Sequence, residues 1–169
     1  MNYSIDNIDA FVFDFDGVLT NNFVYLDQSG IESVRCSRGD GLAFDLLRKI
    51  NKPAYILSTE TNSVVTARAK KLKIEAIQGV LSKEKAINGL AETKGFDLNK
   101  ICYVGNDLND YGVMKLCGYS ACPSDSHPLI KEIATFNLTT KGGYGVVREL
   151  LEKIMQIDFI NILFSKEEV

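Results

Sequence analysis

Near its N-terminus the chain reads Phe11-Val12-Phe13-Asp14-Phe15-Asp16-Gly17-Val18-Leu19-Thr20. The apolar run that ends at Phe13 is typical of a buried strand. Asp14 and Asp16 would point to the same face of that strand, and Gly17 allows a sharp turn after them. Two neighbouring carboxylates at the end of a buried strand repel each other unless a cation or a shared proton offsets the repulsion. The segment therefore predicts a catalytic or metal site there; the alternative is a strand that simply exits into an acidic surface loop.

The composition is typical of one globular domain in a reducing compartment. The chain has 169 residues, 46% of them hydrophobic, so residues 1–169 are predicted to form a single domain around one sizeable core. A net charge of −3 argues against binding to nucleic acid, and we expect no secretory signal and no membrane span. The four cysteines lack Cys-x-x-Cys spacing, so we expect free thiols, no zinc site and a cytoplasmic location.

Strand and helix patterns alternate along the rest of the chain. This alternation predicts an α/β fold, a Rossmann-like doubly wound parallel sheet with ligands at the carboxyl ends of its strands. Asp40 is expected to cap the first helix. Residues 21–38 carry a turn signal between apolar runs and are expected to form a projecting β-hairpin. Further strands are expected at residues 54–57, 75–77, 101–104, 119–121 and 136–138, and helices at 41–50, 63–72, 83–94, before 116, from 128 and at 146–155.

Three further groups are predicted to lie at these strand ends. Ser58 follows the second strand, where a hydroxyl can hold a phosphate oxygen, although a serine before a helix is usually a cap. Lys83 would keep a nearby carboxylate ionised; alternatively it is a solvated lysine at the start of a helix. The segment Gly105-Asn106-Asp107-Leu108-Asn109-Asp110 offers oxygen ligands for a hard cation, or else an Asx-rich turn.

Taken in order, these groups resemble the motifs of the haloacid dehalogenase-like phosphohydrolases. The first motif reads Asp-x-Asp-Gly-x-x-Thr, the second is a strand-end Ser, and Gln78-Gly79-Val80-Leu81-Ser82-Lys83 matches the third. The resemblance implies that Asp14 attacks phosphorus, that Asp16 handles the proton of the leaving oxygen, and that Ser58 and Lys83 hold phosphoryl oxygens.

The fourth motif departs from the usual family pattern, which is Gly-Asp-x-x-x-Asp. Asn106 stands at the usual aspartate position and Asp107 follows it. The resemblance implies a Mg²⁺ ion held by Asp14, Asp16 and either Asn106 or Asp107. Asp110 would orient Lys83 or a metal-bound water.

The short intervals between the motifs leave no room for a cap domain. Together with the run Gly142–Glu149, this resembles the capless 3-deoxy-D-manno-octulosonate 8-phosphate phosphatase family, with its relatives that act on nine-carbon sialic-type 9-phosphates. The resemblance implies homotetramers built through the hairpins, which would bury Phe23, Tyr25, Ile31 and Val34. The tail of residues 157–169 would dock on a neighbouring subunit or form a helix on its own subunit.

The substrate is a sugar-acid phosphate under this resemblance. Octulosonate phosphatases usually have Ser/Thr-Gly-Arg after the second strand, whereas this chain has Ser58-Thr59-Glu60. The combination of Glu60 with Lys71 resembles the relatives that prefer nine-carbon 9-phosphates. Alternatively, the two side chains form an exposed ion pair that contributes little to stability. The candidate substrate ligands are completed by Thr59, Arg68, Asn109 and Arg148.

A rival interpretation from another class is a non-catalytic domain that assembles with an acylneuraminate cytidylyltransferase. The pathway served, lipopolysaccharide or sialic acid biosynthesis, stays open.

Overall fold

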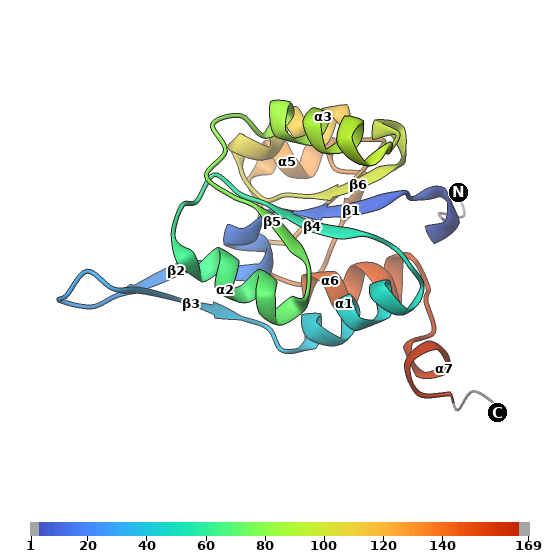
Figure 1. The fold of residues 1–169 in the computed structure, drawn as a ribbon, viewed down its shortest axis with the longest axis horizontal. Coiled ribbons are helices and arrows are strands. Elements are labelled where there is room, and N and C mark those ends of the chain that lie inside the picture. The colour runs from blue at the N-terminus through green and yellow to red at the C-terminus, as the bar shows by residue number, and fades with distance from the viewer. Residues whose placement is uncertain (1–3, 166–169) are drawn as a thin grey trace.

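A single parallel sheet forms the centre of the protein, of which the computed structural model describes residues 4–165 (Figure 1). The strand order is β5-β4-β1-β6-β7-β8, so β1 lies at the point where the chain reverses its direction of winding. This confirms the predicted doubly wound α/β fold. The strands are β1 (Ala10–Phe13), β4 (Ala54–Leu57), β5 (Glu75–Ile77), β6 (Ile101–Val104), β7 (Tyr119–Cys122) and β8 (Phe136–Asn137).

Helices cover both faces of this sheet (Figure 1). One layer contains α3 (Lys83–Lys94), α4 (Tyr111–Leu116) and α5 (Pro128–Ile133). The other contains α1 (Gly39–Lys49), α2 (Ser63–Leu72) and α6 (Val146–Glu149), which continues as a wider turn of helix over Leu150–Ile154. Short 3₁₀ turns span Ile5–Asn7, Leu98–Lys100 and Leu108–Asp110.

Alternate side chains of β1 enter two separate apolar cores. Phe11 and Phe13 pack into the core beneath α1, α2 and α6, whereas Ala10 and Val12 pack into the core beneath α3, α4 and α5. A strand buried on both faces reads as a continuous apolar run. The buried strand expected before Asp14 is therefore the central strand of the sheet.

The predicted hairpin is present and projects away from the sheet (Figure 1). It consists of β2 (Thr20–Leu26) and β3 (Glu32–Cys36), which pair with each other alone. Between Val18 and Gly39, no other structure is inserted, so the chain carries no cap domain here. Phe23 is 70% exposed, and Val24, Tyr25, Leu26 and Ile31 are also exposed.

Asp40 does not cap α1, contrary to the sequence prediction. It lies inside the first turn of that helix and is buried, and its Oδ1 accepts hydrogen bonds from the backbone N–H groups of Val147 (3.0 Å) and Arg148 (3.2 Å). Asp40 thus caps α6, because α1 and α6 pack side by side and the carboxylate reaches across. Its partner is more than a hundred residues away, which local sequence patterns cannot show.

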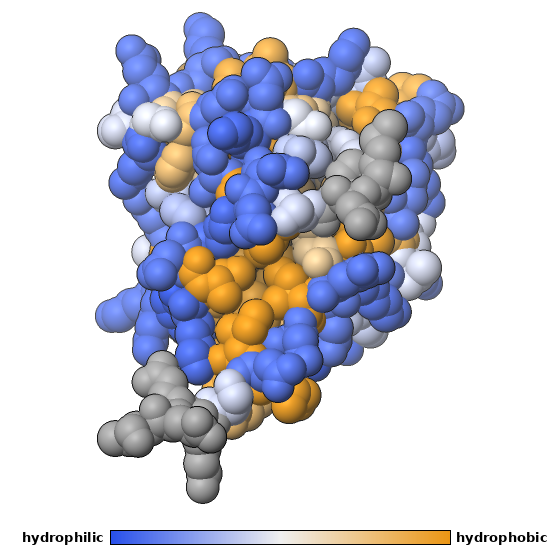
Figure 2. Space-filling view, turned by 90° about the vertical axis from the view of Figure 1, so that its right-hand side faces the viewer, coloured by the Kyte–Doolittle hydropathy of each residue, from blue (hydrophilic) through white to orange (hydrophobic). Residues whose placement is uncertain are grey.

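The C-terminal segment forms a short helix that packs against the core of the same chain. This helix is α7 (Phe159–Phe164); Phe159 is buried against the core, while Ile160 and Phe164 are exposed. Figure 2 looks onto the face where α7 lies and shows apolar side chains gathered there. Residues 166–169 of the predicted tail lie outside the described residues. Within residues 4–165, no helix is both long and apolar enough to span a membrane.

Candidate active site

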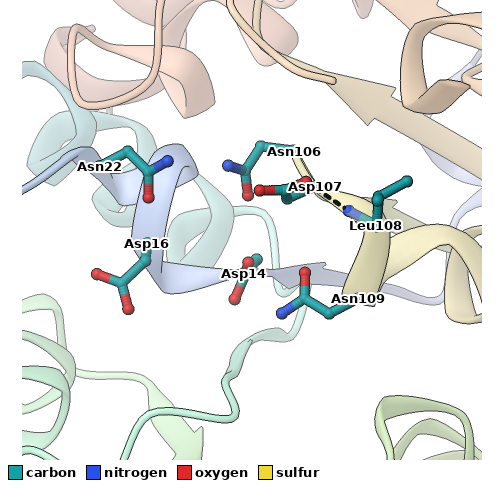
Figure 3. Close-up of a pocket in the computed structure, with 7 residues that line it drawn as sticks. All are labelled: Asp14, Asp16, Asn22, Asn106, Asp107, Leu108 and Asn109. Atoms are coloured by element: carbon teal, nitrogen blue, oxygen red, sulfur yellow. Dashed lines mark hydrogen bonds between the residues drawn. The ribbon is translucent and has the colours of Figure 1, made fainter. Parts of the chain in front are cut away.

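A polar cavity of about 320 Å³ opens at the carboxyl ends of β1 and β6 (Figure 3). This is the crevice at the reversal point of the strand order, where ligands bind in open α/β sheets. Three carboxylates and three amides line it: Asp14, Asp16 and Asp107, and Asn22, Asn106 and Asn109, together with Leu108.

A buried ion triad fixes Asp14 from beneath the cavity. Lys83 Nζ lies 2.9 Å from Asp14 Oδ1 and 2.6 Å from Asp110 Oδ1, and all three side chains are buried. Asp110 Oδ1 also accepts a hydrogen bond from the Tyr103 hydroxyl (2.8 Å). Its Oδ2 accepts from the backbone N–H groups of Asn106 (2.8 Å) and Asp107 (3.3 Å). Asp110 therefore holds both Lys83 and the loop after β6.

The electrostatics of the triad favour a charged Lys83. Burial raises the pKa of Asp14 and the nearby Asp110 carboxylate raises it further, while the Lys83 ammonium lowers it. Burial lowers the pKa of Lys83, but Asp14 and Asp110 outweigh this and raise it. A second cation beside Asp14 would act in the same direction as Lys83 and keep the Asp14 carboxylate ionised.

Asp16 lies in the tight turn that follows Asp14. Gly17 has a φ of 77°, and a side chain at that position would collide with Asn106. The Thr20 hydroxyl accepts from Gly17 N (3.2 Å) and reaches Asp16 Oδ1 at 3.5 Å. Burial raises the pKa of Asp16 and the Glu60 carboxylate raises it further, which suits a group that must carry a proton to a leaving oxygen.

The residues at the cavity mouth fit a hard cation. The Asn106 side-chain amide lies 3.3 Å from Asp14 Oδ2 and 2.8 Å from the Asp16 carbonyl oxygen. With its NH₂ group turned inward it donates to both; with its oxygen turned inward, three oxygens converge, which is the donor type that Mg²⁺ takes. Within residues 4–165, His, Cys, Asp and Glu side chains alone form no group of three. A metal here therefore depends on the Asn106 amide and a backbone carbonyl.

Asp107 and Asn109 occupy different places on the rim. Asp107 Oδ1 accepts from Leu108 N (2.7 Å) and caps the turn at Leu108–Asp110 (Figure 3). Asn109 lines the cavity. Asp107 is thus engaged with its own backbone, whereas Asn106 faces Asp14.

Ser58, Thr59 and Glu60 follow β4, the strand next to β1. Ser58 is buried, and its Oγ accepts from Glu60 N at 3.1 Å. Glu60 Oε1 accepts from Thr61 N (2.6 Å) and Asn62 N (2.8 Å), and Thr59 is exposed. Glu60 is near enough to Asp16 to shift its pKa.

The structure does not bring Arg68 and Lys71 to this cavity within one chain. Both line a second cavity of about 270 Å³ between α1 and α2, and Arg68 Nη2 donates to Ser37 O at 2.6 Å. They lie on α2, whose side chains at these positions face α1. Arg148 is likewise committed elsewhere, because it pairs with Glu152 (2.9 Å) and stacks over Phe159. No ion pair joins Glu60 to Lys71 among residues 4–165, so the exposed ion pair given as the alternative interpretation is absent there.

Comparisons with known proteins give the family. A family model described as haloacid dehalogenase-like hydrolase matches residues 42–150. The 3-deoxy-D-manno-octulosonate 8-phosphate phosphatase of Salmonella typhi is 30% identical over 151 residues, 89% of this chain and 80% of that protein. This chain belongs to the haloacid dehalogenase-like hydrolases.

Solved structures of such hydrolases have the same fold. A HAD family hydrolase from Streptomyces avermitilis has a TM-score of 0.90 at 38% identity, covering 94% of this chain and 91% of that one. The 3-deoxy-D-manno-octulosonate 8-phosphate phosphatase from Moraxella catarrhalis, solved with magnesium ion, phosphate ion and KDO, has a TM-score of 0.86 at 28% identity, covering 90% and 88%. The chain is a phosphatase related to these octulosonate phosphatases.

Three residues of the phosphatase site were missed by sequence reasoning. Tyr103 lies in an apolar run, which predicts a core residue. Only the structure shows that its hydroxyl donates a hydrogen bond to Asp110. Thr20 is the last residue of the first motif and could have been assigned from that. Asn22 lies in β2 with a φ of 63°, and the greater tolerance of asparagine for positive φ is a weak signal for such a conformation.

Proposed function

We propose that this phosphatase hydrolyses the phosphate ester of a 3-deoxy-2-ulosonic acid in a Mg²⁺-dependent reaction through an aspartyl-phosphate. The observation that carries the proposal is the convergence of the Asp14 carboxylate, the Asp16 carbonyl and the Asn106 amide, with the buried Lys83 Nζ 2.9 Å from Asp14. This set provides a nucleophile, oxygens for a hard cation, and a fixed positive charge for an anionic substrate.

The residues act in two steps under this proposal. A carboxylate oxygen of Asp14 attacks phosphorus, and the bond from phosphorus to the sugar oxygen breaks while Asp16 donates its proton to that oxygen. Asp16 then removes a proton from water, the water oxygen attacks phosphorus, and the bond to Asp14 breaks. Lys83 and Ser58 hold phosphoryl oxygens throughout. The raised pKa of Asp16 supports its role as the acid.

Asp14, the Asp16 carbonyl and Asn106 would hold the Mg²⁺ ion. When bound, the ion neutralises charge on the phosphoryl oxygens. Asn106 is favoured over Asp107 because Asp107 bonds to Leu108 N. The magnesium ion in the related Moraxella phosphatase supports the choice of metal.

A nine-carbon sialic-type 9-phosphate is the favoured substrate, and 3-deoxy-D-manno-octulosonate 8-phosphate is the alternative. Glu60 supports the first, because it places negative charge near Asp16 where octulosonate phosphatases usually have arginine. The identity to the Salmonella phosphatase supports the second. Lys71 supports neither substrate, because within one chain it lies at the second cavity and not at the active site.

The phosphatase would work as a homotetramer in the cytoplasm. Four consecutive hairpin residues are exposed: Phe23, Val24, Tyr25 and Leu26. Neither face of the hairpin is therefore covered there by other described residues of the same chain. All four cysteines are free thiols, which agrees with a reducing compartment.

Phosphate release in the presence of Mg²⁺ tests the proposal. The substrates are octulosonate 8-phosphate, deaminoneuraminate and acetylneuraminate 9-phosphates, and glucose 6-phosphate. We expect preference for an ulosonate, loss of activity in EDTA, and no turnover by Asp14→Asn. Asp97→Asn, at the opposite end of the sheet, is the matched control and should retain activity. Equal rates on all four sugars would reject the ulosonate assignment, and no turnover at all would favour the assembly-domain interpretation.

A further inference from the structure

We propose that the Asn22 side-chain amide binds the leaving group of the substrate, through a hydroxyl on the carbon next to the one that carries the phosphate. This inference rests on the proposed function. Among the described residues 4–165, Asn22 is the one cavity-lining residue that comes from the hairpin, so it would join the projecting hairpin to substrate choice.

The backbone holds Asn22 in an unusual conformation at the cavity. Its φ of 63° lies in the left-handed region, and the pairing of β2 with β3 shifts register between Thr20 and Val24. Such bulges redirect a side chain. The Thr20 hydroxyl accepts from Asn22 N (3.3 Å) and also from Gly17 N (3.2 Å). One buried threonine thus ties Asn22 to the turn that carries Asp16.

The Asn22 side chain is free to bind a ligand. Within residues 4–165 its amide makes no hydrogen bond, and Figure 3 shows it facing Asn106 across the cavity, on the same side as Asp16. Lys83 and Ser58 serve the phosphate, whereas Asp16 serves the leaving oxygen. A group beside Asp16 therefore meets the sugar rather than the phosphate, and an amide both donates to and accepts from a hydroxyl.

A simpler explanation for Asn22 is conformational. Asparagine tolerates positive φ better than other residues with a Cβ, so the bulge alone could account for it. The two explanations differ in what Asn22→Gly does. Glycine adopts this backbone conformation readily, so a purely conformational role leaves catalysis unchanged, whereas a binding role is lost with the amide.

The experiment compares two substrates that differ by one hydroxyl. Wild-type and Asn22→Gly proteins are assayed with Mg²⁺ on 2-hydroxypropyl phosphate and on propyl phosphate, and on the preferred ulosonate phosphate. We expect Asn22→Gly to lower kcat/KM about 3- to 10-fold on the two hydroxylated substrates, the size of one neutral hydrogen bond, and to leave propyl phosphate unchanged. Most of the change should appear in KM. Ser29→Gly, at the far end of the hairpin, is the control variant and should behave as wild type.

The outcomes separate this inference from the proposed function. Unchanged kcat/KM on all three substrates, or an equal loss on all three, would overturn the role of Asn22 while the phosphatase assignment stands. Failure of the wild-type protein to hydrolyse any of the three would overturn the proposed function and this inference with it. Selective loss on the hydroxylated substrates supports both.

Discussion

Asp110 is the residue on which the position of Lys83 depends. It accepts four hydrogen bonds from protein groups, two on each carboxylate oxygen. A buried carboxylate with this many donors is stable as an anion, and a lost donor leaves an oxygen with incomplete hydrogen bonding.

Removing the Tyr103 hydroxyl should therefore lower stability. We expect Tyr103→Phe to reduce the free energy of unfolding by about 1–2 kcal/mol, because Asp110 Oδ1 then keeps only the hydrogen bond from Lys83. Urea denaturation of the two proteins measures this. Tyr55→Phe is the control, since within residues 4–165 the Tyr55 hydroxyl bonds to no carboxylate, and it should change little. Equal losses in both variants would contradict the assignment.

Asn106 should make metal binding weaker than an aspartate would. We expect Asn106→Asp to tighten Mg²⁺ binding about tenfold, measured by calorimetric titration without substrate, because it adds a negative charge to the oxygen cluster. Asn109→Asp adds the same charge at the rim and should have a smaller effect. If Asn109→Asp gave the larger gain, Asn106 would not be the ligand.

At the scale of the element, Glu149 on α6 fixes the loop that enters this helix. Its carboxylate accepts from the Thr139 hydroxyl (2.6 Å) and from the backbone N–H groups of Thr139 (3.1 Å) and Thr140 (2.7 Å). Although burial raises the pKa of Glu149, these hydrogen bonds lower it to about 2. The pKa of Glu149 in the folded state lies below the ordinary value of 4.5. The ionised carboxylate therefore stabilises the folded state fully above pH 4.5, and this stabilisation is lost as the pH falls toward 2.

This pH dependence can be tested by substitution. We expect Glu149→Gln to be about 1–3 kcal/mol less stable than wild type at pH 7, and the difference to shrink below pH 4.5. Unfolding measured from pH 7 to pH 3 gives the curve. Glu152→Gln removes an exposed carboxylate on the same helical segment, and its effect should be under about 1 kcal/mol. A pH-independent difference for Glu149→Gln would rule out the carboxylate as its source.

Most elements could be predicted from the sequence because their signals are local. Ser82 and Gly95 bound α3 at the expected residues, since a cap and a left-handed glycine act within one turn. Asp40 was assigned to the wrong helix because its partners come from α6. The order of motif residues along the chain placed Asp14, Lys83 and Asp110 in one site, but Tyr103, Asn22 and the position of Arg68 follow from packing between distant segments.

At the scale of the whole molecule, six of the strands found within residues 4–165 form one parallel sheet, and the remaining two form the hairpin outside it. That residues 1–169 form a single domain stays a prediction. The exposed apolar residues of the hairpin are the feature that one chain leaves unexplained, because a two-stranded ribbon is only marginally stable by itself.

The hairpin should therefore control the oligomeric state. We expect the wild-type protein to be a tetramer by size-exclusion chromatography with light scattering. The double variant Phe23→Asp/Leu26→Asp should dissociate, because it places one charge on each face of the hairpin. Ser29→Asp adds charge only at the turn and should remain assembled. A monomeric wild-type protein would exclude assembly through the hairpin.

The triad of Asp14, Lys83 and Asp110 also bears on how reaction rate and folding are related. Lys83 is held by two carboxylates without any substrate, so under the proposed function its ammonium group is already fixed where it would meet the phosphate. Little reorganisation energy is then needed when charge moves during phosphoryl transfer, whereas water dipoles would have to reorient. Folding fixes this arrangement and buries the two like charges of Asp14 and Asp110 on either side of Lys83. Under the proposed function, the same three side chains therefore contribute both to the conformational stability of the protein and to its catalytic rate.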